Sequence, residues 1–401
     1  MKASKTKKYY ETYDYNSRRP VFVELESLRK DQQYRLMESK NFCMIPWTHI
    51  HGFPTGEAYP CCLGEMAHPI GNMRENTLEE IWHGDTYVGM REQMLADKPS
   101  RECTRCYEQE EQGFFSMRNS HNKHFGHHID KVDQGVNPDF ELVYWDIRFS
   151  NQCNLKCRSC GPMFSSLWYD DHVKMHGQAP NHKRIEWAGK NKTDIWEQMI
   201  PHIDHIEQIY FAGGEPLIMQ EHYNILKELV RRKRFDVKLI YNTNFNETLY
   251  KDLDVLDYWG MFDSVSIGAS LDASGDRAEL MRSGCDWNKI VHNRQRMLEV
   301  CPDVDFYISP TVSLMNVLHV PDFHRAWVDS GLLKAQDLNV NILQSPDWYR
   351  ADCLPKELKA QATQKLEEHI AWLEPQDHLQ RATNGFRSTI SFMNNTDNTQ
   401  H

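Results

Sequence analysis

The sequence lacks any long apolar run and any excess of basic charge. No stretch approaches the roughly eighteen apolar residues of a membrane-spanning helix, and the first residues lack the apolar core of a signal peptide. We therefore expect a cytoplasmic protein that does not bind or cross a membrane. The formal net charge of -11 argues against a broad nucleic-acid-binding surface, which would require a basic field.

The rest of the composition is that of a folded globular protein. A chain of 401 residues with 26% charged and 40% hydrophobic residues is long enough for a sizeable core and for more than one domain. Residues 1–20 are rich in Lys, Tyr and Ser, and we expect them to form a disordered basic arm. The polar end of the chain, 394–401, is also expected to be disordered.

Eleven cysteines stand out in a chain without a recognisable secretion signal, where metal binding or catalysis is a commoner use of thiols than disulfides. Eight of them fall between Cys43 and Cys160 in clustered spacings. The other three, Cys285, Cys301 and Cys353, stand alone, and we interpret them as small apolar side chains without a chemical role.

Cys153, Cys157 and Cys160 form a C-x3-C-x2-C motif directly after an apolar stretch, Leu142 to Phe149. Three thiolates can hold three irons of a [4Fe-4S] cluster and leave the fourth iron open. Clusters that only carry electrons usually take four protein thiolates. The motif therefore favours a cluster that binds a small molecule at its open iron.

From Leu142 onward, apolar strand-like runs alternate with helical patterns, which predicts β/α units around a parallel sheet. The predicted strands are 142–149, 206–212, 237–242, 264–271, 305–312 and 338–343. The predicted helices are 163–174, 220–232, 249–258, 287–300 and 320–332. Six such units make a partial barrel, and a helical extension is expected over 354–401.

A glycine-rich motif, Gly213-Gly214-Glu215-Pro216, follows the second predicted strand. Two glycines allow a ligand to approach the backbone closely, and the neighbouring carboxylate can accept hydrogen bonds from an ammonium group. A glycine turn with a surface glutamate is the alternative. The position of the motif, one β/α unit after the three cysteines, favours the ligand-binding interpretation.

Together, the cysteine motif and Gly-Gly-Glu-Pro resemble the radical S-adenosylmethionine (SAM) enzymes over roughly 142–344. The resemblance implies an α/β fold, a partial (β/α)6 TIM-like barrel over 140–345, with SAM bound through its amino and carboxylate groups at the open iron. It also implies one-electron cleavage of SAM to a 5'-deoxyadenosyl radical that abstracts hydrogen. Ser159 departs from the family, which usually has an aromatic residue before the third cysteine.

The same resemblance implies further contacts with SAM at the ends of later strands. These involve Asn242 and Asn244 near the ribose, Ser270 and Asp272 near the methionine carboxylate or the substrate, and Arg282 at the cofactor's carboxylate. The family usually has glycine where this chain has Phe245 and Ala273. Capping of strand-to-helix turns by Ser270 and Asp272, and a solvated surface position for Arg282, remain alternatives.

A second cysteine pattern precedes the barrel. It runs C-x12-G-x4-C from Cys43 through Gly56 to Cys61, followed by Cys103-x2-Cys106. With the segment Gly71-Asn72-Met73-Arg74, it is similar to the SPASM/twitch module of radical maturases, here over 21–130. The likeness implies an auxiliary [4Fe-4S] cluster held by Cys43, Cys61, Cys103 and Cys106.

Several features of this module remain open from the sequence. The related module normally follows the barrel, whereas here it precedes it. The thiols alone also suit a structural zinc site. Cys62 is the alternative to Cys61 as a ligand, and the sequence does not decide whether three or four thiols bind the auxiliary cluster. The histidine-rich segment His121–His128 is interpreted as a solvated linker between the module and the barrel.

The function expected from these motifs is hydrogen abstraction from a peptide or protein substrate by a maturase-like radical SAM enzyme. Such an enzyme requires an external one-electron donor of the flavodoxin or ferredoxin type. A small-molecule or nucleotide substrate is the second hypothesis. A non-catalytic iron–sulfur or zinc-binding scaffold is the third, and Gly213 to Pro216 argue against it, because a scaffold needs no cofactor chelation.

Overall fold

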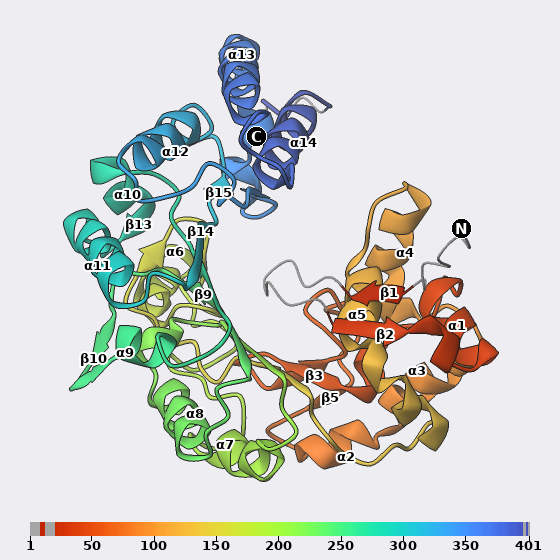
Figure 1. Cartoon of the computed structure of the whole chain (residues 1–401). Helices are drawn as coiled ribbons and strands as arrows, with labels where there is room; N and C mark the ends of the chain where they lie inside the picture. Colours follow the sequence, from red (N-terminus) through yellow and green to blue (C-terminus); the bar gives the residue numbers. More distant parts are fainter. Residues whose placement is uncertain (1–8, 13–20, 396–397, 400–401) are drawn as a thin grey trace, which may run out of the picture. The chain divides into compact units, whose positions relative to one another are not determined.

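The computed structural model describes residues 9–12, 21–395 and 398–399, with side chains from residue 26 onward. The chain divides into two compact units (Figure 1). The first is built from the chain up to Ser150 together with Glu186–Gly213 and Lys227–Leu239, and the second from Asn151–Ile185, Gly214–Leu226 and the chain from Ile240 onward.

The first unit contains a sheet with the strand order β8-β6-β3-β4-β5. Its strands are β3 (His49–Gly52), β4 (Glu57–Tyr59), β5 (Gly71–Asn72), β6 (Tyr144–Ile147) and β8 (Gln208–Phe211). β6 pairs in parallel with both β3 and β8, whereas β3, β4 and β5 pair antiparallel. The cysteine-rich segment therefore supplies strands to the same sheet as the first predicted barrel strand.

Helices and a short hairpin complete the first unit. The helices are α1 (Lys30–Met37), α2 (Leu78–Trp82), α3 (Asp85–Leu95), α4 (Thr104–Glu111), α5 (Met117–Phe125) and α7 (Asp194–Met199). Among the 3-10 helices is η4 (Gly126–Gln134). β1 (Tyr9–Thr12) and β2 (Val21–Glu24) pair antiparallel. Four residues of the predicted disordered arm thus form a strand, and the rest of residues 1–20 lies outside the described chain.

The second unit contains strands in the order β9-β12-β14. These are β9 (Lys238–Thr243), β12 (Val265–Ala269) and β14 (Asp305–Ile308), and β12 and β14 pair in parallel. Two-residue pairings add β7 (Lys156–Cys157) with β13 (Arg282–Ser283) and β15 (Thr311–Val312) with β16 (Asn341–Ile342). α8 (Gln220–Arg231) and β9 each contain residues of both units.

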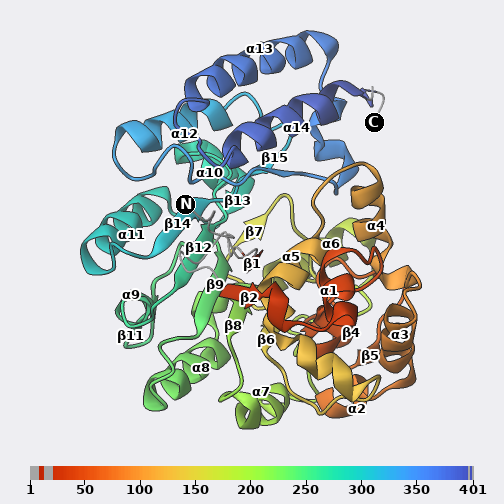
Figure 2. The ribbon, with the colours of Figure 1, turned by 45° about the vertical axis from the view of Figure 1, so that its right-hand side comes forward.

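The helices of the second unit cover its strands on one side and extend the chain at its end. They are α6 (Tyr169–His176), α9 (Val255–Trp259), α10 (Gly275–Met281), α11 (Trp287–Val300), α12 (Val320–Asp329), α13 (Lys356–Leu373) and α14 (Arg381–Asn395). Figure 2 shows α13 and α14 side by side. The predicted C-terminal helices are thereby present. The first two residues of the predicted tail belong to α14, and residues 396–397 and 400–401 lie outside the described chain.

The predicted alternation of strands and helices is confirmed, although α7 and α10 were not predicted and two predicted elements differ in the structure. The helix predicted over 249–258 is wrong in its first half, where β10 (Leu249–Tyr250) and β11 (Leu253–Asp254) form a hairpin. The helix begins only at Val255, because the Asp254 side chain accepts a hydrogen bond from the Leu256 backbone and caps it. The sixth predicted strand is reduced to the two residues of β16.

The compact units do not coincide with the predicted boundaries at 130 and 140. β6 and β8 belong to the same unit as the cysteine-rich segment because β3 pairs with β6. No strand was predicted at β3, since one apolar residue between two histidines is a weak strand pattern.

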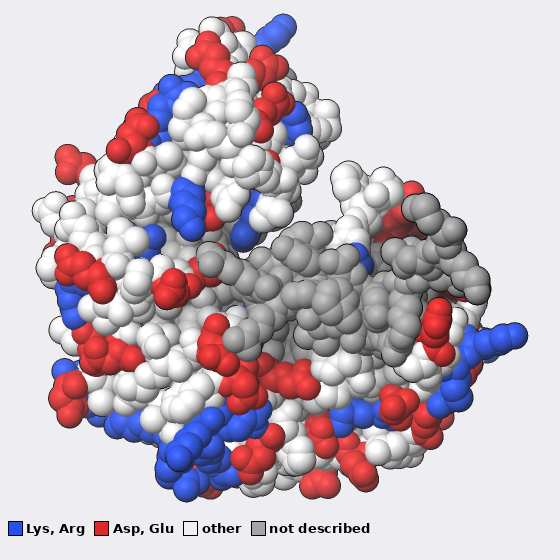
Figure 3. Space-filling view, viewed as in Figure 1, with Lys and Arg blue, Asp and Glu red and all other residues white. Residues whose placement is uncertain are grey.

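Charges on the face shown in Figure 3 are largely interspersed, and basic side chains gather over the region of α8. α8 ends at Arg231, and Arg232, Lys233 and Arg234 follow it. Arg231, Arg232 and Arg234 each form an ion pair with a nearby carboxylate, which neutralises much of this basic segment. Among the described residues, no helix is both long and apolar enough to cross a bilayer.

Candidate functional site

The three cysteines of the first motif lie together in the second unit. Burial raises the pKa of Cys153 to about 12 and that of Cys160 to about 11, and in each case a neighbouring thiol of the triad adds to the shift. The backbone N–H of Cys160 donates to the carbonyl of Cys157 at 3.0 Å, which closes a tight turn between them. Three thiols that influence one another in a buried loop form a ligand set for a soft metal or an iron–sulfur cluster.

The loop that carries these thiols is fixed by hydrogen bonds to its backbone. Trp168 Nε1 donates to the carbonyl of Cys157 at 3.0 Å, and the Ser165 hydroxyl donates to the carbonyl of Leu155 at 2.7 Å. β7 also pairs with β13, which places Cys157 opposite Arg282. The side chains are therefore held in place by the protein before any cluster binds.

The Gly-Gly-Glu-Pro loop packs against the start of the cysteine loop. The Glu215 N–H donates to the Gln152 carbonyl at 2.7 Å. Gly213 has φ of +119°, and a Cβ atom at Gly214 would overlap that same carbonyl oxygen. Both glycines are thus required by the close approach of two backbones, and Pro216 begins the short helix that follows, η7 (Pro216–Ile218).

Glu215 is buried, with an exposed fraction of 1%, and its carboxylate points to the end of β9. It accepts hydrogen bonds from the Thr243 hydroxyl and the Asn244 N–H, both at 2.7 Å, and from the Leu217 N–H at 3.1 Å. Burial raises the pKa of Glu215 to about 7 despite these donors. The charge of Glu215 also raises the pKa of Cys153, so the carboxylate and the thiol are neighbours.

Asp272 and Arg282 form a buried ion pair beside the triad. Arg282 Nε lies 2.8 Å from one carboxylate oxygen of Asp272, and Nη2 lies 3.0 Å from the other. The remaining nitrogen, Nη1, donates to Cys157 Sγ at 3.4 Å. The resemblance implied a contact of Arg282 with the cofactor's carboxylate and left a solvated surface position as the alternative. Arg282 is buried, which rules out the solvated position, and its guanidinium contacts Asp272 and a cysteine of the triad, while its contact with the cofactor remains a prediction.

The other residues predicted to lie near the cofactor differ in how deeply they are buried. Asn244 is buried, donates to Asn154 Oδ1 at 2.7 Å and accepts from the Asn246 N–H at 3.0 Å, so it connects the end of β9 to the cysteine loop. Asn242 is exposed on β9. Ser270 is half-buried, and its N–H donates to the Thr243 carbonyl at 2.7 Å. Their contacts with SAM remain predictions.

The cysteines of the second motif line one cavity in the first unit. Cys43, Cys61, Cys103 and Cys106 are all among its lining residues, whereas Cys62 is not. Burial raises the pKa of each of the four thiols, and charges on neighbouring thiols of the set contribute for Cys43, Cys61 and Cys103. The cavity thus groups the four predicted ligands, and Cys62 is not among its lining residues.

Two residues near this cavity were not recognised in the sequence. Arg118 lines it, pairs with Glu110 and donates to the carbonyls of Ser39 and Phe42 at 2.9 and 2.7 Å. His121 also lines the cavity and is buried. The interpretation of 121–128 as a solvated linker is therefore wrong, since these residues belong to α5 and η4. No helix was predicted there because four histidines hide the apolar periodicity by which a helix is recognised in a sequence.

Cys285, interpreted from the sequence as a thiol without a chemical role, is closer to the triad than expected. Its N–H donates to the Arg282 carbonyl at 2.9 Å, and the charge of Cys157 contributes to raising its pKa, after burial as the main cause. Cys285 lies near the triad because β13, which was not predicted from the sequence, pairs with β7.

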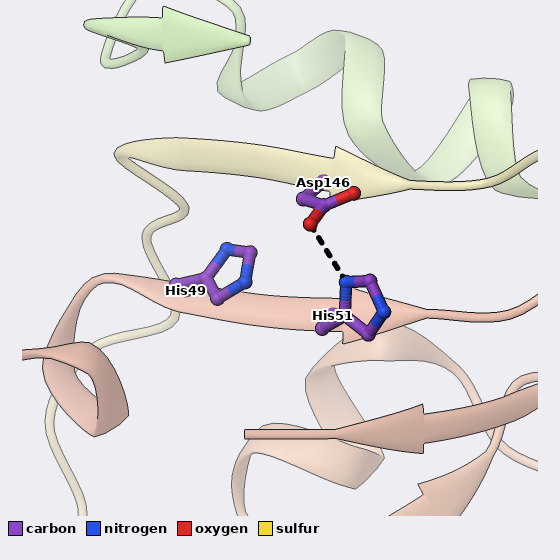
Figure 4. A group of neighbouring side chains, drawn as sticks. All are labelled: His49, His51 and Asp146. Carbon is purple, nitrogen blue, oxygen red and sulfur yellow. Dashed lines mark ion pairs between the residues drawn. The ribbon is translucent and has the colours of Figure 1, made fainter. Parts of the chain in front are cut away.

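A further buried cluster in the first unit consists of His49, His51 and Asp146 (Figure 4). Burial lowers the pKa of His49 to about 4, so that its ring is neutral at pH 7. Burial alone would raise the pKa of Asp146, yet the neighbouring His51 and Arg148 lower it to about 2. The alternation His-x-His, which places two rings on one face of a strand, was the signal available in the sequence.

Residues 43–107 match the family model of SPASM, described as an iron–sulfur cluster-binding domain. This segment is similar to SPASM domains. It contains the four cysteines that line the cavity, and the zinc alternative is thereby disfavoured. The auxiliary module predicted from the spacing of these cysteines is confirmed, in a position before the barrel rather than after it.

Solved structures with partial similarity to this chain include anSMEcpe and SuiB. Native anSMEcpe with bound AdoMet is 19% identical, with 58% of this chain and 59% of that chain covered and a TM-score of 0.39. SuiB of Streptococcus suis is 13% identical, with 72% of this chain and 63% of that chain covered and a TM-score of 0.38. SuiB bound to the precursor peptide SuiA is 15% identical, with 68% of this chain and 60% of that chain covered and a TM-score of 0.36. The chain thus spans about three fifths of the length of these structures. No curated protein matches the chain.

The close packing at Gly214 leads to a testable expectation. Gly214→Ala forces a methyl group against the Gln152 carbonyl, so the two loops must separate and the Glu215–Gln152 hydrogen bond must lengthen. We expect a loss of about 2–3 kcal/mol in the free energy of unfolding, measured by urea titration of the cluster-free protein. The matched control is Gly161→Ala in the same cysteine loop, where a Cβ atom meets nothing within 4 Å. Equal stability of the two variants would contradict the required close approach.

Proposed function

We propose that this protein is a radical SAM enzyme that abstracts hydrogen from a peptide or protein substrate. The observation that carries the proposal is the convergence of Cys153, Cys157 and Cys160 beside a buried glycine–glutamate loop. The Glu215–Gln152 hydrogen bond joins the two motifs on which the resemblance rests. Neither motif alone would distinguish this activity from simple metal binding.

The ligand set fits a [4Fe-4S] cluster with one open iron. Three thiols of one short loop, held by backbone hydrogen bonds, supply three of the four positions, and Arg282 donates a hydrogen bond to one of the sulfurs. A bound cluster would supply one electron to cleave the carbon–sulfur bond of SAM, which yields methionine and the 5'-deoxyadenosyl radical. The protein's own role is to hold the sulfurs, to exclude water and to orient the two substrates.

Glu215 and the glycines before it are proposed to receive the amino group of SAM. Gly213 and Gly214 bring the backbone close to the cysteine loop, and the carboxylate keeps lone pairs beyond those used by Thr243, Asn244 and Leu217. A pKa near 7 in the absence of ligand indicates that a neighbouring cation would be favourable, because it would stabilise the buried charge. An ammonium group provides that cation.

The SPASM domain supports a peptide or protein substrate and a second cluster. Its four thiols provide a closed ligand set, which suits electron transfer better than direct binding of a substrate. An external flavodoxin or ferredoxin-type donor would supply the electron that cleaves SAM. A small-molecule or nucleotide substrate is the second candidate, because the cysteine and glycine motifs specify SAM cleavage without specifying the substrate.

Anaerobic reconstitution tests the proposal. We expect about eight irons per chain, as two [4Fe-4S] clusters require, and formation of 5'-deoxyadenosine after addition of dithionite and SAM. A fully loaded protein that forms none would contradict the enzyme assignment and favour a binding scaffold. Hydrogen abstraction is then tested by deuterium transfer from labelled candidate peptides into 5'-deoxyadenosine, and transfer only from small molecules or nucleotides would exclude the peptide class.

A further inference from the structure

The cluster of His49, His51 and Asp146 lies on two adjacent parallel strands of the first unit. His51 pairs in register with Asp146, and His49 with Tyr144. Because alternate residues of a strand face the same side, both imidazoles and the carboxylate project from one face of the β3–β6 pair (Figure 4). One nitrogen of each ring and one carboxylate oxygen lie within 4.8 Å of one another.

All three side chains are fully buried, with exposed fractions of 0%. His49 Nδ1 lies 2.9 Å from the Tyr144 carbonyl oxygen. A carbonyl can only accept, so Nδ1 carries the proton and Nε2 of this neutral ring presents a bare lone pair. That nitrogen has no hydrogen-bond partner in the protein, and neither has Nε2 of His51.

His51 and Asp146 lie at the distance of an ion pair, but they do not form a well-aligned hydrogen bond. His51 Nδ1 lies 2.8 Å from Oδ2 of Asp146, but neither atom makes a hydrogen bond of acceptable angle, and Oδ1 is also without one. Unsatisfied buried polar atoms are rare in folded proteins, and several of them at one point indicate a missing partner. Because the unsatisfied atoms include lone pairs of two imidazoles and a carboxylate, the partner that suits them is a cation.

We propose that His49, His51 and Asp146 bind a divalent transition-metal ion, of the class of Zn²⁺, Fe²⁺ or Co²⁺, at a site separate from both clusters. Two imidazoles and one carboxylate are a common ligand set for such ions. The hydrogen bond from His49 Nδ1 to the Tyr144 carbonyl is the contact that orients a metal-ligating histidine and fixes its tautomer. Tetrahedral coordination places ligand atoms about 3.4 Å apart, so the three side chains need only approach one another slightly.

The surroundings of the cluster restrict the site. His49 stacks on Tyr144 with 4.2 Å between ring centroids, and His51 packs edge-on against Phe53 at 5.0 Å. Arg148 Nε lies 3.7 Å from Asp146 Oδ1, which leaves the other carboxylate oxygen, Oδ2, for the metal. The aromatic walls exclude water, so we expect the ion to enter while the unit folds rather than afterwards.

The chain offers a matched control in a second histidine cluster. His127 and His128 also combine with a carboxylate, Glu207, but here Nε2 of each ring makes a hydrogen bond to the carboxylate, at 2.8 and 2.9 Å. The histidines are partly exposed, and the carboxylate is 41% exposed. These ring nitrogens already have partners, so we expect no tightly bound metal there.

The test uses the full-length protein produced in medium supplemented with Co²⁺ and then anaerobically reconstituted, so that iron and sulfide occupy the cysteines. After treatment with a chelator and gel filtration, we expect about one Co²⁺ per chain by elemental analysis, and a cobalt-edge X-ray absorption spectrum with nitrogen and oxygen ligands and without sulfur ligands. The double variant His49→Gln/His51→Gln should retain about one tenth of this cobalt or less, and His127→Gln/His128→Gln should retain as much as the unchanged protein. Asp146→Asn, which preserves the shape of the side chain, should also weaken retention.

The inference is overturned if the unchanged protein retains no metal beyond its clusters. It is also overturned if the His49/His51 variant retains as much cobalt as the control, or if the cobalt spectrum shows thiolate ligands. Iron content and circular dichroism verify that each variant folds. Should the double variant not fold, the metal content and spectrum of the unchanged protein and of Asp146→Asn decide the question, and none of these readouts depends on SAM cleavage.

Discussion

Replacing Cys157 by alanine will abolish the formation of 5'-deoxyadenosine. Cys157 is buried, lies on β7 between the other two thiols in sequence, and receives a hydrogen bond from Arg282. With two thiols left, a four-iron cluster has two open irons and is expected to be lost or degraded. The iron content should fall from about eight to about four per chain, and SAM cleavage should fall below detection by chromatography.

Three control variants make this result specific. Cys301→Ala changes a buried thiol whose pKa is influenced by Arg294 and not by the triad, and it should keep both the iron and the activity. Cys103→Ala/Cys106→Ala should also lose about four irons, yet it should still cleave SAM because the first cluster remains. Cys285→Ala should keep the cleavage if three thiols hold the reactive cluster. Persistent cleavage by Cys157→Ala would contradict the assignment of the triad.

The second large effect is expected at Arg282. Arg282→Met leaves Asp272 as an unpaired charge in the protein interior, where the carboxylate is 2% exposed. Removing one partner of a buried ion pair typically costs 3–5 kcal/mol, so we expect the free energy of unfolding of the cluster-free protein to fall by about 3–5 kcal/mol. The Thr311 N–H, at 2.8 Å from Asp272, relieves only part of this cost.

A double-mutant cycle separates the ion pair from other effects. Adding Asp272→Asn to Arg282→Met removes the unpaired charge and should recover much of the lost stability. Arg277→Met is the matched control, because this exposed arginine donates only to the Met315 carbonyl, and its effect should stay within about 0.5 kcal/mol. A cycle with no coupling would show that the pair does not stabilise the fold.

The same substitution also tests the contact with the cluster. Arg282 Nη1 donates to Cys157 Sγ, and hydrogen bonds to cluster sulfurs raise the reduction potential. We therefore expect the reconstituted Arg282→Met enzyme, where it folds, to show a more negative potential in an anaerobic titration followed by electron paramagnetic resonance. An unchanged potential would assign Arg282 a purely structural role.

The strands and most helices followed from local patterns, because apolar periodicity reports which residues are buried. α8, α11 and α12 lie where the sequence predicted helices. The hairpin before α9 was missed, since a turn at Lys251 with φ of +58° has no glycine or asparagine to announce it. β3 was missed because its histidines do not resemble a buried strand.

The sequence alone predicted the candidate ligand sets. Thiol spacing is read directly from the chain: Cys153 to Cys160 and the glycine motif are short segments, and the SPASM cysteines follow one pattern between Cys43 and Cys106. Only the tertiary structure decided what surrounds them, because those contacts join residues far apart in the chain. It placed Arg282 on Cys157, 125 residues away, and Asp146 beside His51, through strand pairings that no periodicity reveals. The reason is physical: local patterns record burial, whereas the partner of a buried charge depends on which strands meet.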